Sequence, residues 1–137
     1  MAYLVGITLA LAVSLFGRVV GLDRDRAFYP TVLAVIAMLY DLFAVMGNSM
    51  PALLSELPVT AIFLLAVVVG FRRNLWIVAA GLVGHGLMDF VHGHFIANPG
   101  VPVWWPAFCA SYDVTAGAWL AGLLRVRNLA TPISKLT

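Results

Sequence analysis

Residues 84–94 read GHGLMDFVHGH and lie within an apolar run that extends from position 75 to position 97. This stretch contains all three histidines of the chain. At about 100° per residue on a helix, His85, Asp89 and His92 fall within a sector of roughly 60° on one face, and His94 falls on the opposite side. Two imidazoles around a carboxylate are costly at membrane depth unless they face a protein interior and have partners there. The stretch therefore predicts a buried polar site.

The composition predicts an integral membrane protein. Of the 137 residues, 63% are hydrophobic and 10% are charged, and the mean hydropathy is +1.01. So few polar side chains cannot cover a soluble globule of this size. The formal net charge of +2 does not indicate a nucleic acid partner, because the basic residues lie where membrane topology places them. Cys109 is the only cysteine, which excludes an internal disulfide and a thiolate metal cluster.

Five apolar segments predict a single all-α domain with five transmembrane helices. They cover approximately residues 2–21, 29–48, 51–71, 75–97 and 105–124. Each is long enough to cross about 30 Å of hydrocarbon at 1.5 Å per residue. Pro30 is tolerated in the first turn of the second segment, whereas Pro58 is expected to kink the third segment or delay its start. The first segment lacks the basic region of a cleaved signal, so we expect it to be retained.

The basic residues predict the orientation in the membrane. With five spans, all eight fall on one side, namely Arg18, Arg24, Arg26, Arg72, Arg73, Arg125, Arg127 and Lys135. The positive-inside rule then places the N-terminus outside and the C-terminus in the cytoplasm. In a bacterium this corresponds to a multi-pass protein of the cytoplasmic membrane. A four-span arrangement would place the arginines at 72 and 73 opposite those at 24 and 26, so we reject it.

This topology brings ionisable residues of four helices to one layer, between the midplane and the outer interface. His85 and Asp41 each lie about ten residues into their spans from the cytoplasmic side. Glu56 lies in the first turns of its span from the outside, and Asp113 lies about two turns into the last span. We therefore expect one cavity in the outer half of the bilayer, opening to the outer face and lined by Asp41, His85, Asp89, His92 and Asp113.

The residue types fit a metal centre. Neutral imidazoles with one or two carboxylates, leaving a position for water, make a catalytic zinc site or, as second choice, a non-haem iron site. The predicted ligands are His85, Asp89 and His92. They span about 10 Å along the helix, so one ion would contact only two of them, either His85 and Asp89 or Asp89 and His92. The segment 29–48 or the segment 105–124 would complete the set, and two ions would use all three residues. Catalytic or orienting roles are assigned to Asp41, Glu56 and Asp113.

Several cofactors are excluded. Haem does not fit, because His85 and His92 share one helix face and could not lie on opposite sides of a porphyrin. There is no phosphate-cradling glycine loop for a nucleotide and no His-Glu-x-x-His motif. A retinal Schiff base is excluded within the spans, since the only lysine is Lys135 in the tail.

The same residues could instead be structural. The histidine and aspartate face could form a hydrogen-bonded network that locks the helices together. Asp41 and Asp113 could make hydrogen bonds between helices, and Glu56 could cap its helix near the N-terminus. The side chains that we expect simply to pack are Tyr40, Cys109 and Tyr112.

Residues 98–106, NPGVPVWWP, form a stiff aromatic loop. Trp104 and Trp105 could belong to the aromatic belt that anchors spans at the headgroup level. Alternatively, the two indoles could form a lid over a site that opens towards the outer leaflet. In both cases we expect the loop to lie above Asp89 and His92.

The leading interpretation is a small membrane enzyme that uses a metal-bound water, in hydrolytic chemistry, on a lipid-like or amphipathic substrate. One alternative is a metal-free acid–base isomerase of an isoprenoid or sterol-like substrate. The other is a proton or metal-ion transport subunit, which would also need polar groups along the inner half of its spans. The inner half of the spans has no charged side chains apart from the terminal arginines, which favours an enzyme. The expected partners are membrane lipid and a small lipid-like molecule, and a homo-oligomer stays open.

The arrangement resembles two kinds of membrane enzyme. Transmembrane histidines with an aspartate, here His85, Asp89 and His92, are similar to the pattern of membrane metallohydrolases of the ceramidase and adiponectin-receptor type. Those enzymes combine histidines, aspartate and serine around zinc, but they have seven spans, and here all histidines lie on one helix, so no residue role is carried over. The layout also resembles five-span sterol isomerases of the emopamil-binding type, which place histidine and carboxylates in an intramembrane pocket.

Overall fold

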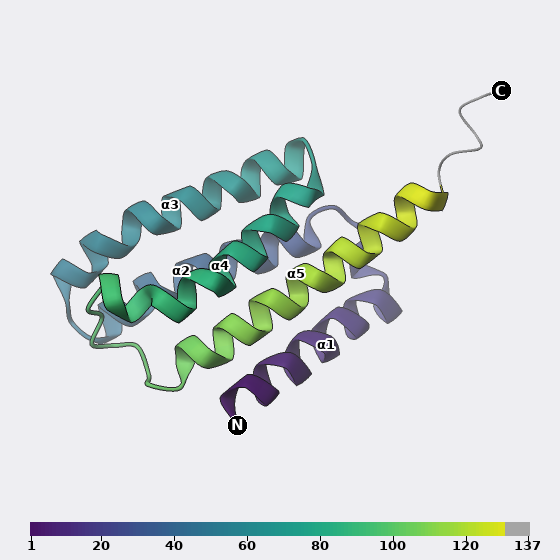
Figure 1. The fold of residues 1–137 in the computed structure, drawn as a ribbon. Helices are drawn as coiled ribbons and strands as arrows, with labels where there is room; N and C mark the ends of the chain where they lie inside the picture. Colours follow the sequence, from purple (N-terminus) through teal and green to yellow (C-terminus); the bar gives the residue numbers. More distant parts are fainter. Residues whose placement is uncertain (131–137) are drawn as a thin grey trace.

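Five long helices account for most of the described chain (Figure 1). The structure is a computed structural model that describes residues 1–130, with side chains to residue 128. Its helices are α1 (Ala2–Val20), α2 (Phe28–Met46), α3 (Met50–Arg72), α4 (Leu75–Phe95) and α5 (Trp105–Ala130), and a short 3-10 helix, η1 (Leu22–Arg24), follows α1. Residues 1–130 contain no strand. The prediction of an all-α protein is therefore confirmed.

All five helices are long and apolar enough to cross a membrane. The expected spans agree with them to within a few residues, except that α5 continues six residues beyond the expected end at 124. Pro58 lies inside α3 and does not delay its start, because the helix already begins at Met50. Ser49 caps this start, and its side-chain oxygen accepts a hydrogen bond from the backbone N–H of Ala52 at 3.2 Å.

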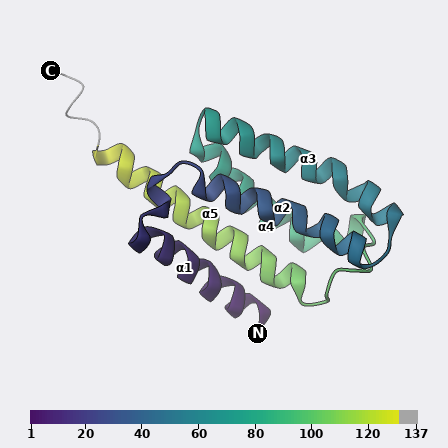
Figure 2. The same cartoon turned by 180° about the vertical axis from the view of Figure 1, so that it is seen from behind.

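The helices alternate in direction, and α4 is the central one (Figure 1, Figure 2). It packs against α5 and α3 and also contacts α2. Helix α1 lies on the far side of α5 and is peripheral, and its only charged residue is Arg18 in the last turn. Side chains on the inward face of α4 are therefore surrounded by α2, α3 and α5.

An apolar core fills the half of the bundle near the start of α4. Its fully buried members come from three helices and include Leu33, Val78, Leu82 and Leu120. Large apolar side chains also remain exposed on the outer faces of α1 to α4, for example Leu65 at 63%. Soluble monomers rarely expose so much contiguous apolar surface, whereas lipid-facing helices do. The first ionisable residue of α4 is His85, about one turn after Leu82. The candidate site therefore lies on the side of this core that is nearer to the end of α4.

The arginine-rich end of the bundle is held by hydrogen bonds from side chains to backbone. Arg26 donates from Nε and Nη2 to the carbonyl oxygen of Phe71 at 3.2 and 2.9 Å. Arg127 Nη2 donates to the carbonyl oxygen of Asp23 at 2.8 Å. Seven of the eight basic residues lie at this end, and the eighth, Lys135, lies outside the described residues. The charge asymmetry of the sequence is thus an asymmetry of the folded bundle.

Candidate metal centre

Gly86 lets α4 approach α5 closely. A Cβ atom at this position would lie 2.8 Å from the carbonyl oxygen of Ala110 and 2.9 Å from Cγ2 of Val114, so a larger residue would push the helices apart. The close approach brings the preceding residue, His85, against Asp113 of α5. His85 Nδ1 donates a hydrogen bond to Asp113 Oδ2 at 2.7 Å.

Four buried side chains meet at this point, and we call them the His85 cluster: His85 and Asp89 of α4 with Cys109 and Asp113 of α5. One potential ligand atom from each lies within 4.8 Å of the others. Cys109 Sγ is 3.6 Å from Asp113 Oδ2, and Asp89 Oδ2 is 3.7 Å from His85 Nδ1. None of the four is more than 2% exposed. Nitrogen, oxygen and sulfur atoms at this spacing could bind a metal ion.

Two carboxylate oxygens of the cluster are buried without a hydrogen-bond partner, Asp89 Oδ2 and Asp113 Oδ1. A buried acceptor without a donor costs about 1–3 kcal/mol, and more if it is charged. The single N–H at His85 Nδ1 already serves Asp113, and the described arginines lie at the far end of the bundle. A bound cation is one kind of partner that could satisfy such oxygens. The unpaired oxygens are therefore compatible with a cation, as is the spacing of the potential ligand atoms.

The donor set suits zinc best. Zinc binds thiolate, imidazole and carboxylate at about 2.0–2.3 Å in tetrahedral geometry, which separates the ligand atoms by roughly 3–4 Å. The spread of 4.8 Å in the His85 cluster is close to that range. Sulfur disfavours magnesium and calcium, which prefer oxygen ligands. The iron site with two histidines and one carboxylate needs a second imidazole, and His85 is the only one in the cluster.

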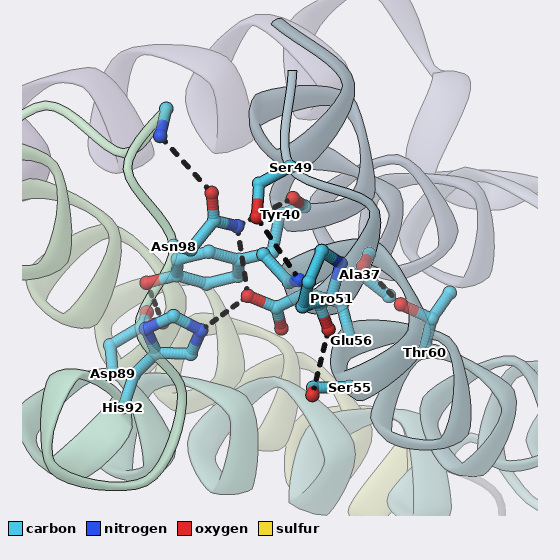
Figure 3. Close-up of polar contacts among 12 residues, drawn as sticks. Ala37, Tyr40, Ser49, Pro51, Ser55, Glu56, Thr60, Asp89, His92 and Asn98 are labelled. Atoms are coloured by element: carbon cyan, nitrogen blue, oxygen red, sulfur yellow. Dashed lines mark hydrogen bonds and ion pairs between the residues drawn. The ribbon is translucent and has the colours of Figure 1, made fainter. Parts of the chain in front are cut away.

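His92 belongs to a separate group, the His92 network, which consists of Tyr40, Glu56, His92 and Asn98 (Figure 3). His92 Nε2 donates to Glu56 Oε1 at 2.8 Å, and Asn98 Nδ2 donates to the same oxygen at 2.9 Å. Asn98 Nδ2 also lies 3.0 Å from the carbonyl oxygen of Tyr40. The ring of Tyr40 stacks on His92 with 4.0 Å between centroids. Glu56 Oε1 thus has two donors, whereas Asp89 Oδ2 has none.

Tyr40 joins the two groups (Figure 3). Its hydroxyl donates to Asp89 Oδ1 at 2.7 Å, while its ring lies against His92. The side chain is buried, so water does not compete for this hydrogen bond. One oxygen of Asp89 is fixed by Tyr40, and the other stays free on the side of His85. Tyr40 is therefore a positioning residue for the His85 cluster.

The structure brings together one of the two expected ligand sets. His85 and Asp89 are completed by Asp113 from α5, one of the helices expected to supply the third ligand. His92 lies outside the group and is bound to Glu56 instead. The geometry therefore favours the set with His85 over the set with His92.

Asp41 is not brought into this cluster. It is half-buried on α2, and the groups that interact with it are Thr60 and Glu56 of α3. Tyr40, one position earlier and about 100° round the helix, is the residue that α2 turns towards α4. Glu56 does not cap α3, since Ser49 does so. A catalytic role of Asp41 or Glu56 stays a prediction.

The loop between α4 and α5 covers the His92 end of the site, as expected. Beneath it lies a pocket of about 260 Å³ whose lining includes His92, Asn98 and Pro102. Gly100 permits the loop to approach α2 closely, because a Cβ atom there would collide with the carbonyl oxygen of Phe43. The loop is thus held against α2 directly over the His92 network.

Trp104 and Trp105 do not line that pocket. Trp104 is 56% exposed, and Trp105 packs edge-on against Phe43 of α2 with 4.9 Å between ring centroids. Within the described structure the proline segment of the loop, rather than the two indoles, covers His92. The lid role assigned to the tryptophans stays a prediction. Trp105 lines a second hollow instead.

This second hollow, which we call the lateral groove, runs between α1, α2 and α5. It has a volume of about 530 Å³ and a mainly apolar lining, with Trp105 at one end and Asp25 at the other. Cys109 is the one residue that belongs both to this lining and to the His85 cluster. The thiol is therefore the boundary between the groove and the candidate metal centre.

Sequence reasoning missed the roles of Tyr40, Cys109 and Asn98. Cys109 precedes Asp113 by four residues, which places both on one face of a helix and was a usable signal. Tyr40 and Asn98 are residue types that commonly pack or end helices, and nothing in their spacing marks them.

Comparison with known proteins returned no relative. No family model matches the chain, and searches of curated proteins and of solved structures found no match. The functional assignment therefore rests on the geometry described above.

Proposed function

We propose that the protein is a small integral-membrane enzyme whose His85 cluster holds a divalent metal ion, with zinc favoured over iron. Its chemistry is of hydrolytic type, and its substrate is a lipid-like or amphipathic molecule. The observation that carries this proposal is the combination of four convergent donor atoms with two buried carboxylate oxygens that lack any hydrogen-bond partner. A purely structural network would be expected to satisfy those oxygens.

The roles of the residues follow from their contacts. His85, Asp89 and Asp113 would hold the ion, and metal ligation through His85 Nδ1 would require that nitrogen to be deprotonated. Such an ion supplies an activated water or polarises a carbonyl oxygen. Tyr40 fixes the carboxylate of Asp89 through its hydroxyl. A catalytic zinc uses three protein ligands and keeps one position open, and Cys109 would be the donor nearest to a substrate in the groove.

Metal analysis of purified protein tests this function. The protein should be prepared without chelator and without nickel affinity resin, and its metal content measured by mass spectrometry. About one zinc ion per chain is expected. Protein that binds no stoichiometric metal even after zinc is added would overturn the proposal.

A second candidate is metal-free acid–base chemistry, such as isomerisation of an isoprenoid or sterol-like substrate. The observation that favours it is the 2.7 Å contact between His85 Nδ1 and Asp113 Oδ2, which is the geometry of an imidazole oriented by a carboxylate. The metal analysis separates the two candidates, because only the first requires an ion.

We further propose that the N-terminus lies outside and that the arginine-rich end of the bundle faces the cytoplasm. The site would then lie in the outer half of the bilayer, and in a bacterium the protein would belong to the cytoplasmic membrane. Topology reporters fused at Thr137 should be active only in the cytoplasm. Activity of such a fusion on the outer side would reverse the orientation.

A further inference from the structure

We propose that the substrate is an acyl-linked membrane lipid, an ester or an amide, whose acyl chain lies in the lateral groove and whose carbonyl group lies next to Cys109. This inference rests on the proposed function and names its substrate class and route. It starts from the fact that Cys109 is shared by the groove and the His85 cluster. A molecule in the groove is separated from the candidate metal centre by one thiol side chain.

The shape of the groove suits a single linear chain. Its lining on α2 runs from Phe28 to Leu39, which is about 17 Å along the helix axis. A volume of about 530 Å³ over this length makes it long and narrow. The lining between its two ends is mainly apolar, and it lies at the depth of the membrane-crossing helices, so hydrocarbon is the matching occupant.

The position of Cys109 along the groove fixes the direction of the chain. Trp105 lies at the end of the groove next to the loop, and tryptophan marks the headgroup level in membranes. Cys109 lies one turn deeper, about 6 Å along α5. Carbonyl groups that link acyl chains to headgroups lie at this depth, just inside the headgroups. The chain then extends from Cys109 towards Phe28.

Trp105 adds a polar group at the same end. Its Nε1 is buried and has no hydrogen-bond partner among the described residues. The carbonyl or headgroup oxygens of a lipid would supply acceptors there. The groove thus combines an apolar length with an unpaired donor where the polar part of a lipid would lie.

The reaction balances with water alone. Rotation of the Cys109 side chain opens the cluster to the groove. Water adds across the bond between the carbonyl carbon and the oxygen or nitrogen of the headgroup. The hydroxyl goes to the carbonyl carbon and the proton goes to the leaving oxygen or nitrogen, which yields a carboxylic acid and an alcohol or amine. No oxidant or reductant is needed.

Photo-crosslinking in lipid nanodiscs tests the placement of the chain. The nanodiscs contain phosphatidylcholine with a trace of one of two phosphatidylcholine probes, with a diazirine near the carbonyl or near the terminal methyl of one acyl chain. Labelled residues are mapped by mass spectrometry. The first probe should label Phe108 and Cys109, and the second should label Phe28 and Val32. Reversed labelling, or labelling that does not depend on the position of the diazirine, would overturn the proposal.

Two substitutions that narrow the groove, with one matched control, complete the test. Val35→Trp should lower labelling by both probes several-fold, whereas Thr31→Trp, deeper in the groove, should lower only labelling by the terminal probe. The control is Val45→Trp, the same substitution on the same helix at a similar exposure, 61% against 56% for Val35, outside the groove lining. If both groove variants are labelled to the same extent as Val45→Trp, the groove does not hold the acyl chain.

A diazirine sterol serves as the competing occupant. We expect it to label the groove weakly, and labelling equal to that by the acyl probes would contradict a linear chain. The metal content of the same samples is measured in parallel. If the proposed function is wrong, the protein should lack metal but show the expected labelling. If only this inference is wrong, labelling should be absent or misplaced in protein that holds its metal.

Discussion

His85 and His92 lie on the same face of α4, about 10 Å apart along the axis, yet their surroundings differ in one decisive respect. Around His92, Glu56 Oε1 receives two hydrogen bonds from protein donors. Around His85, one oxygen of Asp89 and one of Asp113 have no hydrogen-bond donor among the described residues. Each place combines one buried histidine with at least one buried carboxylate. A network of histidine and carboxylate is therefore a candidate metal site only where protein donors leave its oxygens unpaired.

The largest effect is expected from His85→Ala. The cluster loses its only imidazole, so zinc content should fall by about tenfold or more relative to the wild type. The measurement is metal mass spectrometry on purified protein after dialysis against zinc-free buffer. His94→Ala is the matched control, because His94 is exposed on the other side of α4, and it should keep its metal. Full zinc content in His85→Ala would remove the distinction between the two regions.

A smaller effect is expected from Tyr40→Phe. The substitution deletes the hydroxyl that fixes Asp89 Oδ1 but keeps the ring that stacks on His92. Loss of such an outer hydrogen bond typically weakens metal affinity by about 10–100-fold. Competition with a chelator of known affinity measures the change. Tyr112→Phe should leave the affinity unchanged, and an unchanged affinity in Tyr40→Phe would show that Tyr40 only packs.

His92→Ala should change stability rather than metal content. Glu56 Oε1 loses one of its two donors, which costs about 2 kcal/mol for a charged acceptor. Thermal unfolding in detergent should therefore move several degrees lower while bound zinc stays at the wild-type level. His92→Gln, which keeps an N–H donor, should recover part of the loss. If His92→Ala removes zinc as completely as His85→Ala, the ligand set of Asp89 and His92 is the correct one.

The smallest effect is expected from Asp41→Asn. Asp41 interacts with Thr60 and Glu56 and shares no partner with the His85 cluster, and sites without shared partners act independently. Zinc content and chelator competition should both match the wild type. A clear loss of zinc in this variant would return Asp41 to the site and would mean that α2 is rotated relative to the structure.

Much of the fold could be predicted from the sequence, because hydropathy and helix length are local properties. The five spans and the collection of basic residues at one end needed only the order of residues along the chain. The spacing of His85 and Asp89 also sufficed to place both on one inward face. Asp113 was expected at the same layer because its depth follows from residue counting.

The partners of each side chain could not be predicted in the same way, because they depend on how each helix is rotated about its axis. On α2 the small residues Ala37 and Ala44 are buried, but the inward face is centred on Tyr40 and not on Asp41. That difference of about 100° decides which group reaches Asp89. Asn98 reaches Glu56 only because the loop folds back over α4, which no periodic pattern encodes.

X-ray absorption at the zinc edge distinguishes a metal ion held by the His85 cluster from one held by the His92 network. The protein should be purified without chelator, loaded with one equivalent of zinc and measured in nanodiscs. We expect one sulfur neighbour at about 2.3 Å, from Cys109, with one imidazole and carboxylate oxygens at about 2.0–2.2 Å. A spectrum with two imidazoles and no sulfur, or zinc that remains hydrated and unbound, would contradict this expectation.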